Sequence, residues 1–250
     1  MKILFSPSES KSLENSCNSL ELDTFLFDNL MHKREQVIKH YQYFINNSTQ
    51  DKLQKLFGIK DKNLIKTLKG INIFKDSTQK AILRYNGVGY SYLCYDSLDH
   101  KNKKFLDNNM IIFSNLFGPI LAKTCIPYYK LKQGEKIEDF SLEKFYKREF
   151  SSSLDRYLKD ELIIDLRANF YEKFYLPGTR YYTFKFLKNG KVVSHWAKAF
   201  RGKIARELAI YQPQNEDELM QIEFNNLKIK EIKEIKNKKE FIFEIGGIDG

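Results

Sequence analysis

Three short apolar runs, separated by long helical patterns, place the strongest limit on how this chain can fold. The runs lie at 2–5, 110–113 and 161–166, and polar or glycine-rich segments follow each of them. Such runs are typical of strands buried within a sheet. The intervening stretches 25–68 and 141–158 have helical patterns. We therefore predict a mixed α/β (α+β) fold with a mixed central sheet.

Sequence patterns in the C-terminal half predict two β-hairpins. Asn189-Gly190 separates the strand patterns 180–187 and 192–196, and Asn-Gly at such a position is a strong hairpin signal. We expect a helix over 197–209 and a shorter one from Asn215. The second hairpin is expected from 227–235 and 241–245. Its Lys/Glu-rich tract, 228–240, suits an exposed edge strand protected by lysines. We treat 1–250 as a single domain.

Composition excludes several classes of protein. Mean hydropathy is -0.51 and no apolar run approaches the ~20 residues of a membrane span, so we expect a cytoplasmic protein with no membrane partner. Cys17, Cys94 and Cys125 form no CxxC pattern and suit a reducing compartment; Cys94 and Cys125 are expected to pack in apolar surroundings. The four histidines are scattered, so we expect neither a metal site nor a cofactor.

The positive charge is concentrated in one segment. Net charge is +10, yet 174–206 contains eight basic residues and no acidic one, while the other 217 residues hold 34 basic against 32 acidic side chains. The same segment contains eight aromatic residues. Interleaved cations and rings suit a polyanion with stackable bases. A half-buried strand with aromatics inward and lysines outward is the alternative.

The helix expected after the first hairpin carries a candidate anion clamp. Lys198 and Arg201 share one face at helical spacing, Arg206 lies close behind, and Gly202 permits close approach of a ligand. A solvated helix face is the alternative. The candidate phosphate-binding residues in this basic segment are Arg180, Lys185, Lys198, Arg201, Lys203 and Arg206.

Two further segments are candidate ligand sites. Gly87-Val88-Gly89, followed by Tyr90, is similar to the turn of a helix-hairpin-helix motif, which requires a positive φ or a close phosphate approach at one glycine. A helix stop before a new helix gives the same letters. The loop 6–11 follows the first strand and could bring Lys11 to a ligand, although a simple capping loop is the alternative. The acids, including Asp165, form no recognisable catalytic pair.

The order of these motifs resembles the YaaA family of peroxide-stress-resistance proteins, and the resemblance spans nearly the whole chain. The residues that carry it are Ser6, Pro7, Lys11, Gly87, Tyr90, Phe117, Gly118, Pro127, Tyr128, Leu166, Tyr171, Asn189, Gly190, Ala197, Lys198, Arg201 and Gly202. The resemblance implies a positively charged cleft, a helix-hairpin-helix-like element, DNA binding, and a role in limiting damage by hydrogen peroxide and free iron. This chain has Ala168-Asn169-Phe170-Tyr171 where the family usually has Ser-x-Glu-Tyr.

Three functions remain open at this point. The first is a monomeric DNA-binding stress protein that contacts phosphates through the basic segment. The second is an enzyme acting on a nucleotide, nucleoside or damaged base held by the same cations, with Lys11 and Tyr90 at its site. The third is a module whose basic face binds an acidic protein.

Overall fold

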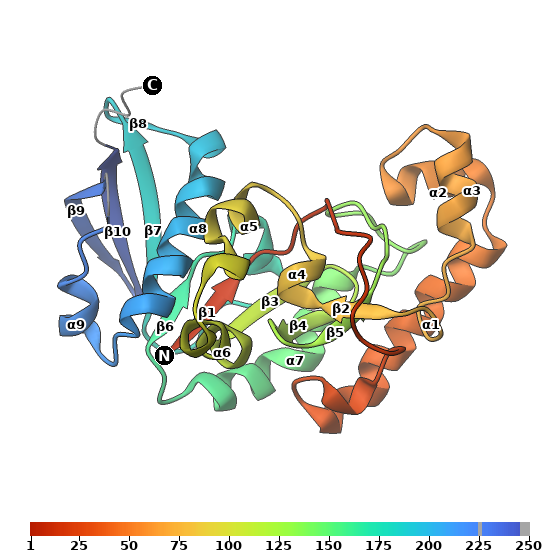
Figure 1. Ribbon diagram of the computed structural model, residues 1–250, viewed down its shortest axis with the longest axis horizontal. Helices are drawn as coiled ribbons and strands as arrows, with labels where there is room; N and C mark the ends of the chain where they lie inside the picture. The colour runs from red at the N-terminus through yellow and green to blue at the C-terminus, as the bar shows by residue number, and fades with distance from the viewer. Residues whose placement is uncertain (225–226, 246–250) are drawn as a thin grey trace.

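The computed structural model describes residues 1–224 and 227–245, and a mixed central sheet runs through it (Figure 1). The strand order is β4-β3-β1-β6-β7-β10-β9, and β8 pairs with β7. The strands of this sheet are β1 (Lys2–Phe5), β3 (Met110–Ser114), β4 (Gly118–Leu121), β6 (Ile163–Asp165), β7 (Tyr181–Lys188), β8 (Lys191–Val192), β9 (Leu227–Ile235) and β10 (Lys238–Ile245).

The centre of the sheet is parallel and its edges are antiparallel. β1 pairs in parallel with β3 on one side and with β6 on the other, so Leu4 lies opposite both Ile111 and Asp165. β7 and β10 continue the parallel order, whereas β4 and β9 pair antiparallel at the two ends. A separate two-stranded sheet joins β2 (Thr78–Lys80) to β5 (Cys125–Pro127). This arrangement confirms the predicted mixed α/β class.

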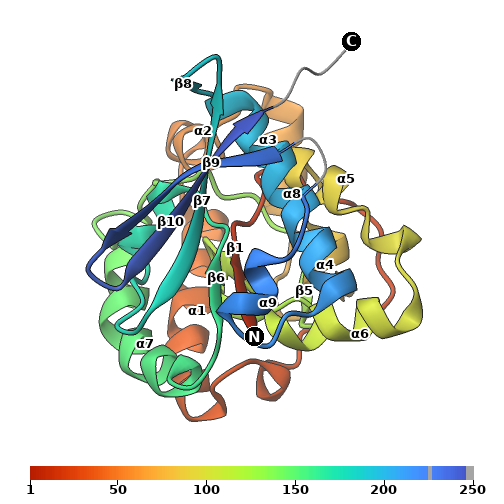
Figure 2. The same ribbon diagram turned by 90° about the vertical axis from the view of Figure 1, so that its left-hand side faces the viewer.

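Helices cover both faces of the sheet. Figure 2 shows α7 on one face and α6 and α8 on the other, while Figure 1 places α2 and α3 at the end away from β9. The helices are α1 (Met31–Asn47), α2 (Gln50–Phe57), α3 (Lys62–Lys69), α4 (Ala81–Arg84), α5 (Val88–Leu93), α6 (His100–Asn109), α7 (Leu142–Leu158), α8 (Ser194–Tyr211) and α9 (Glu216–Met220).

The three strands predicted from apolar runs are confirmed, because burial on both faces of the sheet leaves a continuous apolar run. Ile3 and Leu4 of β1 and Ile163 and Ile164 of β6 are completely buried. Both hairpins are also confirmed. Asn189 (φ 51°) and Gly190 (φ 73°) adopt the left-handed backbone that the first hairpin turn requires. β9 exposes most of its side chains at the sheet edge, as its Lys/Glu pattern predicted.

Other boundaries differ from prediction. The segment 192–196 was expected to be a strand, which is wrong. β8 ends at Val192 and α8 begins at Ser194, so only Lys191 and Val192 pair with β7 after the turn. The helix that follows the glycine turn is short, because the left-handed backbone of Cys94 (φ 48°) ends α5. β2, β4, β5 and α6 were not predicted.

Candidate functional site

The candidate site lies at the carboxyl ends of β1 and β6. These strands pair in parallel, so the residues that follow them, Ser6 and Leu166, leave the sheet at the same edge. On either side of β1 the sheet continues through β3 or β6. Open α/β sheets bind ligands where neighbouring connections diverge in this way.

Two adjoining cavities open at this edge, and together we call them the cleft. They share Ala168, Lys198 and Arg201. The β7 chamber, of about 480 Å³, is lined by the shared residues and by Asp165, Arg167, Asn169, Glu172, Thr183, Phe184, Lys185, Phe186, Val192, Val193, Ala197, Lys238 and Glu240. The N-terminal chamber, of about 380 Å³, is lined by the shared residues and by Phe5, Ser6, Pro7, Ser8, Glu9, Gly87, Val88, Gly89, Tyr90, Gln133, Leu166 and Tyr171. Cavities of this size hold small organic ligands.

A buried ion pair helps to form the floor of the β7 chamber. The guanidinium of Arg167 contacts both carboxylate oxygens of Asp165, at 2.8 and 2.6 Å. Its remaining N–H groups donate to the carbonyls of Tyr171 (3.1 Å) and Tyr175 (3.0 Å), and it lies 4.2 Å from the ring centroid of Phe113. A buried pair is stabilising only when its hydrogen bonds are satisfied in this way. The guanidinium of Arg167 therefore already has hydrogen-bond partners within the protein and is poorly placed to bind a ligand.

Lys198 and Arg201 stand between the two chambers without a protein partner. They lie three residues apart on α8, and neither side chain makes a hydrogen bond or ion pair with any residue that the structure describes. Burial lowers the pKa of the half-buried Arg201, while the charge of Asp165 opposes that shift. An unpaired cation that is already partly desolvated interacts strongly with an incoming anion.

The cleft is not uniformly positive. Arg167 is paired with Asp165, and Lys238 lies 3.3 Å from Glu240. The charged lining residues outside these pairs are the cations Lys185, Lys198 and Arg201 and the carboxylates Glu9 and Glu172. The positive character of the site is thus concentrated near α8 and β7.

The N-terminal chamber offers mostly neutral polar groups. The Tyr90 hydroxyl donates to the Ser6 carbonyl at 2.9 Å, and burial raises the pKa of this phenol well above its usual value. Ser6 Oγ accepts from the backbone N–H of Ala168 at 2.8 Å, which fixes the loop after β1 to the loop after β6. Gln133 reaches the chamber through the loop after β5 and donates its backbone N–H to Glu9 at 3.1 Å. Such groups can orient a ligand by hydrogen bonding.

One buried hydroxyl in the β7 chamber has no partner. Thr183 lies opposite Asp165 on β7, and its Oγ1 makes no hydrogen bond within the described protein. Buried polar atoms are normally satisfied, so an unpaired hydroxyl in a cavity wall is available to a ligand or to water. Neither Thr183 nor Gln133 was singled out from the sequence.

The predicted glycine turn lies in the cleft wall, but the expected positive φ is wrong for both glycines. Gly87 is extended (φ 176°), and Gly89 belongs to α5 and is absent from the positive-φ glycines. A Cβ at Gly89 would lie 3.3 Å from the Lys198 carbonyl, and a Cβ at Gly202 would overlap the Gly89 carbonyl. These glycines allow α5 and α8 to pack closely, which accounts for their presence without a ligand. A close phosphate approach here stays a prediction.

Lys11 lies behind the N-terminal chamber and lines neither cavity. Its ammonium donates to the Ser8 carbonyl at 3.1 Å and lies 4.1 Å from the ring centroid of Tyr129. Burial, reinforced by the charge of Lys130, lowers the pKa of Lys11 to about 7. The structure therefore does not bring Lys11 into the cleft beside Lys198 and Arg201.

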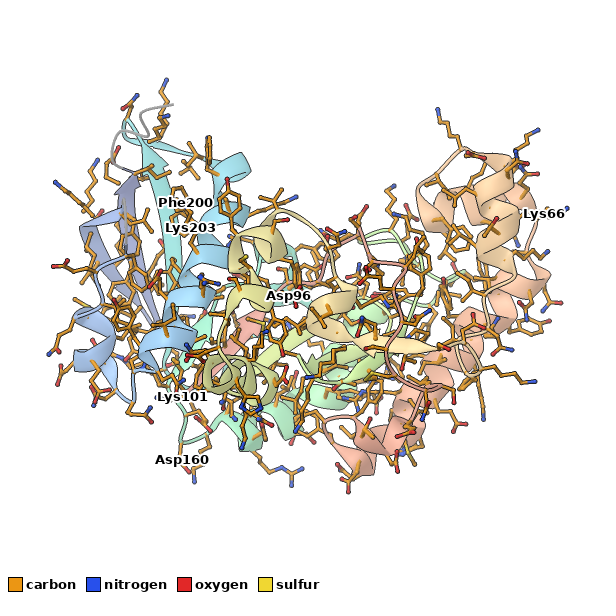
Figure 3. The ribbon with its side chains drawn as sticks, viewed as in Figure 1. Lys66, Asp96, Lys101, Asp160, Phe200 and Lys203 are labelled. Carbon is orange, nitrogen blue, oxygen red and sulfur yellow. A yellow bond between two sulfur atoms is a disulfide. The ribbon has the colours of Figure 1, made fainter. Side chains whose placement is uncertain are left out.

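Three other predicted cations also lie outside the cleft. Arg206 donates to the carbonyls of Leu93 and Cys94 at the end of α5. Lys203 lies over the rings of Tyr92 and Phe200, and Figure 3 shows Phe200 and Lys203 along α8. Arg180 forms ion pairs at 3.2 and 3.0 Å with Glu216 and Glu234, respectively. Of the predicted residues, the cleft thus contains Gly87, Gly89, Tyr90, Lys185, Lys198 and Arg201.

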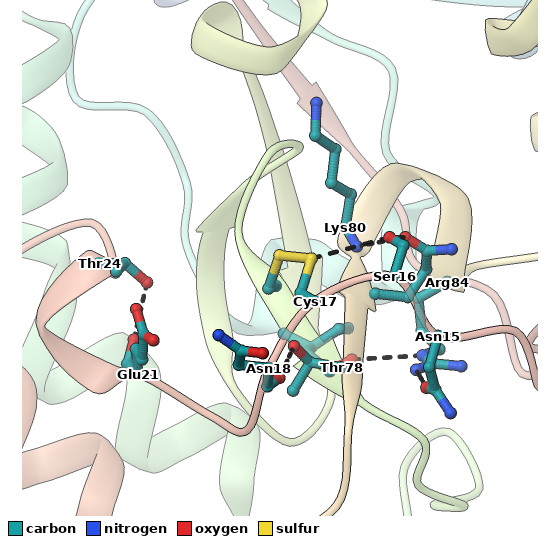
Figure 4. Close-up of a disulfide and its surroundings, with 12 residues drawn as sticks. Asn15, Ser16, Cys17, Asn18, Glu21, Thr24, Thr78, Lys80 and Arg84 are labelled. Carbon is teal, nitrogen blue, oxygen red and sulfur yellow. Dashed lines mark hydrogen bonds between the residues drawn. A yellow bond between two sulfur atoms is a disulfide. The ribbon is translucent and has the colours of Figure 1, made fainter.

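The predictions for the cysteines were wrong. Cys17 and Cys125 form a disulfide (Figure 4), and Cys94 is exposed instead of packed in an apolar environment. The pairing joins positions 108 residues apart, and spacing alone gives no signal for it. Among residues 1–224 and 227–245, no cluster of His, Cys, Asp or Glu side chains could hold a metal ion. Within the same residues no helix is long and apolar enough to span a membrane.

The chain is similar to known proteins over nearly its whole length. Residues 1–233 match a family described as peroxide stress protein YaaA. The chain is 48% identical over 245 residues to an uncharacterized protein of Campylobacter jejuni, covering 98% of this chain and 99% of that protein. It is 29% identical over 252 residues to a UPF0246 protein of Fusobacterium nucleatum, covering 97% and 98% of the two chains, respectively. A UPF0246 protein of Corynebacterium efficiens is 32% identical over 216 residues, covering 84% and 85%.

Proposed function

Because the chain belongs to the peroxide stress protein YaaA family, we propose that it binds DNA and limits damage by hydrogen peroxide and free iron. In this proposal Lys198 and Arg201 bind a phosphate of the DNA backbone at the junction of the two chambers. Lys185, on β7, binds the next phosphate along the strand. The resemblance suggests DNA as the ligand, and the chemistry of the cleft supplies the contacts.

The observation that carries the proposal is the absence of protein partners for Lys198 and Arg201. The three predicted cations of the basic segment that lie outside the cleft have partners within the protein. Arg180 pairs with carboxylates, Arg206 donates to carbonyls, and Lys203 lies over aromatic rings. A phosphate would give Arg201 the charged hydrogen-bond partner that the protein does not provide. Thr183 Oγ1 offers an additional donor in the β7 chamber.

The proposal is tested by DNA affinity at fixed ionic strength. We expect Lys198→Ala and Arg201→Ala each to weaken binding of a short duplex about tenfold at ~0.15 M salt, equivalent to about 1.4 kcal/mol. The matched control is Lys144→Ala/Lys147→Ala, which removes two exposed lysines from α7 on the opposite face of the sheet (Figure 2). Equal losses in the control and in the cleft variants would mean that binding is unspecific and the cleft is not the site.

The N-terminal chamber favours a second candidate, an enzyme acting on a nucleotide, nucleoside or damaged base. Its neutral lining could hold a base while Lys198 and Arg201 hold the adjoining phosphate. Burial keeps the Tyr90 phenol protonated, so it can serve as a hydrogen-bond donor but not as a base near neutral pH. Tyr90→Phe should then alter turnover or nucleotide affinity and leave binding of a long duplex near normal. A loss of duplex binding alone would remove the support for an enzyme.

A further inference from the structure

The Cys17–Cys125 disulfide joins two segments whose other ends both form the wall of the N-terminal chamber. The first segment runs from Ser6 to Cys17, and the second from Cys125 to Gln133. Ser6, Ser8 and Glu9 line the chamber at one end of the first segment, and Gln133 lines it at one end of the second. At the opposite ends, the Cα atoms of the two cysteines are 6.5 Å apart, within the usual range for a disulfide.

Both segments also pair with the same strand, β2. Cys17 forms an antiparallel bridge with Thr78 of β2, while Cys125 of β5 pairs with Lys80 on the other side of β2. Figure 4 shows the disulfide beside Lys80 and Thr78. The covalent link therefore fixes the first segment to β5 and not only to β2.

The two segments also meet without covalent bonds nearer to the chamber. The backbone N–H of Gln133 donates to Glu9, and the Lys11 ammonium lies 4.1 Å from the ring centroid of Tyr129. Arg84 adds a shared anchor, since it donates to the carbonyls of Ser12 and Ile126 at 2.5 and 3.3 Å. The wall is thus a continuous set of contacts with the disulfide at its far end.

Both cysteines line a cavity through which small reagents would reach them. They are half-buried, and the cavity, of about 560 Å³, shares no lining residue with the cleft. Cysteine oxidation and thiol exchange depend on such access. For a chain expected to work in a reducing compartment, a disulfide of this kind is usually transient and redox-sensing.

We propose that Cys17 and Cys125 form a reversible dithiol–disulfide site that hydroperoxides oxidise, and that the bond sets the order of the cleft wall. One thiolate attacks a peroxide oxygen, an S–O bond forms, the O–O bond breaks, and the released oxyanion is protonated, giving water from hydrogen peroxide or an alcohol from an organic hydroperoxide. The second thiolate then attacks the sulfenic acid, forming the S–S bond and releasing water. The two thiols supply two electrons and two protons, and an external dithiol returns them when it reduces the bond.

The oxidised form should hold the chamber wall in one arrangement. Closing a link between the segments removes alternative positions of residues 6–17 relative to 125–133, which lowers the entropy lost when a ligand binds. We expect the oxidised protein to bind DNA at least threefold more tightly than the reduced protein. This consequence for DNA rests on the proposed function, whereas the thiol chemistry and the ordering do not.

The thiol chemistry is tested in a Cys94→Ser background, which removes the exposed third cysteine. Reduced protein treated with hydrogen peroxide should lose two titratable thiols and about 2 Da, and dithiothreitol should restore both. Cys17→Ser and Cys125→Ser should each stop at a sulfenic acid, about 16 Da heavier. Oxidation of the intact pair to sulfinic acid without a disulfide would overturn the proposal.

The ordering is tested by hydrogen exchange on the oxidised and reduced forms of the same protein. Amides in 6–17 and 125–133 should exchange at least threefold more slowly when the bond is present, and Cys17→Ser/Cys125→Ser should show no response to peroxide. If the exchange rates and the DNA affinity are both the same in the oxidised and reduced forms, the disulfide does not order the cleft wall. That result would overturn this inference, but it would not contradict DNA binding. If the disulfide slows amide exchange but the protein binds no DNA, the redox site is supported and the proposed function is rejected.

Discussion

Two lysine-rich regions of this molecule have opposite electrostatic outcomes. On the cleft side, the side chains of Lys198 and Arg201 of α8 form no ion pair with any described residue. In the C-terminal hairpin, Lys230 pairs with Glu244 and Lys239 pairs with both Glu216 and Glu234. These lysines of the hairpin are thus paired with carboxylates of the hairpin itself or of α9. For the proposed binding surface, the comparison therefore gives more weight to unpaired charge than to the number of basic residues.

Charge reversal should separate the two regions most strongly. Lys198→Glu/Arg201→Glu should weaken DNA binding about 100-fold at ~0.15 M salt, because two attractive contacts become repulsive. Lys230→Glu/Lys233→Glu, on the edge strand β9, should change affinity less than about twofold. Fluorescence anisotropy with a labelled duplex measures both. Similar losses for the two double variants would break the distinction between the regions.

The close packing of α5 on α8 should be sensitive to one added methyl group. Gly202→Ala would place a Cβ against the Gly89 carbonyl, and overpacking of this kind costs about 1–3 kcal/mol of unfolding free energy. Gly190→Ala meets no atom within 4 Å, so only its left-handed backbone (φ 73°) opposes the change, at about 1 kcal/mol. Urea unfolding at constant pH gives both values. A larger loss at Gly190 would contradict the packing assigned to the helices.

Two lysines should respond to pH with opposite signs. Lys11, behind the cleft, has a pKa lowered by burial from 10.5 to about 7, so the unfolded chain binds more protons between these values and stability should rise with pH across that window. Hydrogen bonding to Glu216 raises the pKa of Lys239, so its stabilising contribution is present below its unfolded value and is lost as pH rises through the folded one. Lys11→Met should therefore stabilise the protein most at about pH 6.

The control for this experiment is Lys239→Met, which should destabilise the protein near neutral pH and lose its effect at high pH. Thermal unfolding of the two variants and the wild type at several pH values measures the differences. A Lys11→Met effect that stays constant from about pH 6 to 10 would show that the lysine does not titrate in this range.

The smallest effect is expected at Arg180, which the sequence placed among the phosphate-binding residues. Its guanidinium is held by Glu216 and Glu234, so Arg180→Ala should change DNA affinity less than about twofold. Lys185→Ala removes a cation of β7 that lines the β7 chamber; it is the matched comparison and should weaken binding about threefold to tenfold. A greater loss for Arg180→Ala would extend the binding surface beyond the cleft.

Local patterns predicted the buried parallel strands and the hairpins, because burial and turn chemistry act over a few residues. The run at Ile3–Leu4 and the Asn189-Gly190 turn needed no knowledge of the rest of the chain. Helical spacing placed Lys198 and Arg201 together, and the structure brings both into the cleft. The partners that removed Arg180 from the site lie 36 and 54 residues away, and Cys17 meets Cys125 across 108 residues. Such contacts depend on the topology of the sheet and have no local signal.

The salt dependence of DNA binding tests the central claim most directly. Each lost phosphate contact should reduce the slope of log affinity against log salt concentration by about 0.9. We therefore expect Lys198→Ala/Arg201→Ala to reduce the slope by about 2, and Lys144→Ala/Lys147→Ala on α7 to leave it unchanged. A wild-type slope that the cleft variant retains in full would contradict the assignment of these two residues to phosphate binding.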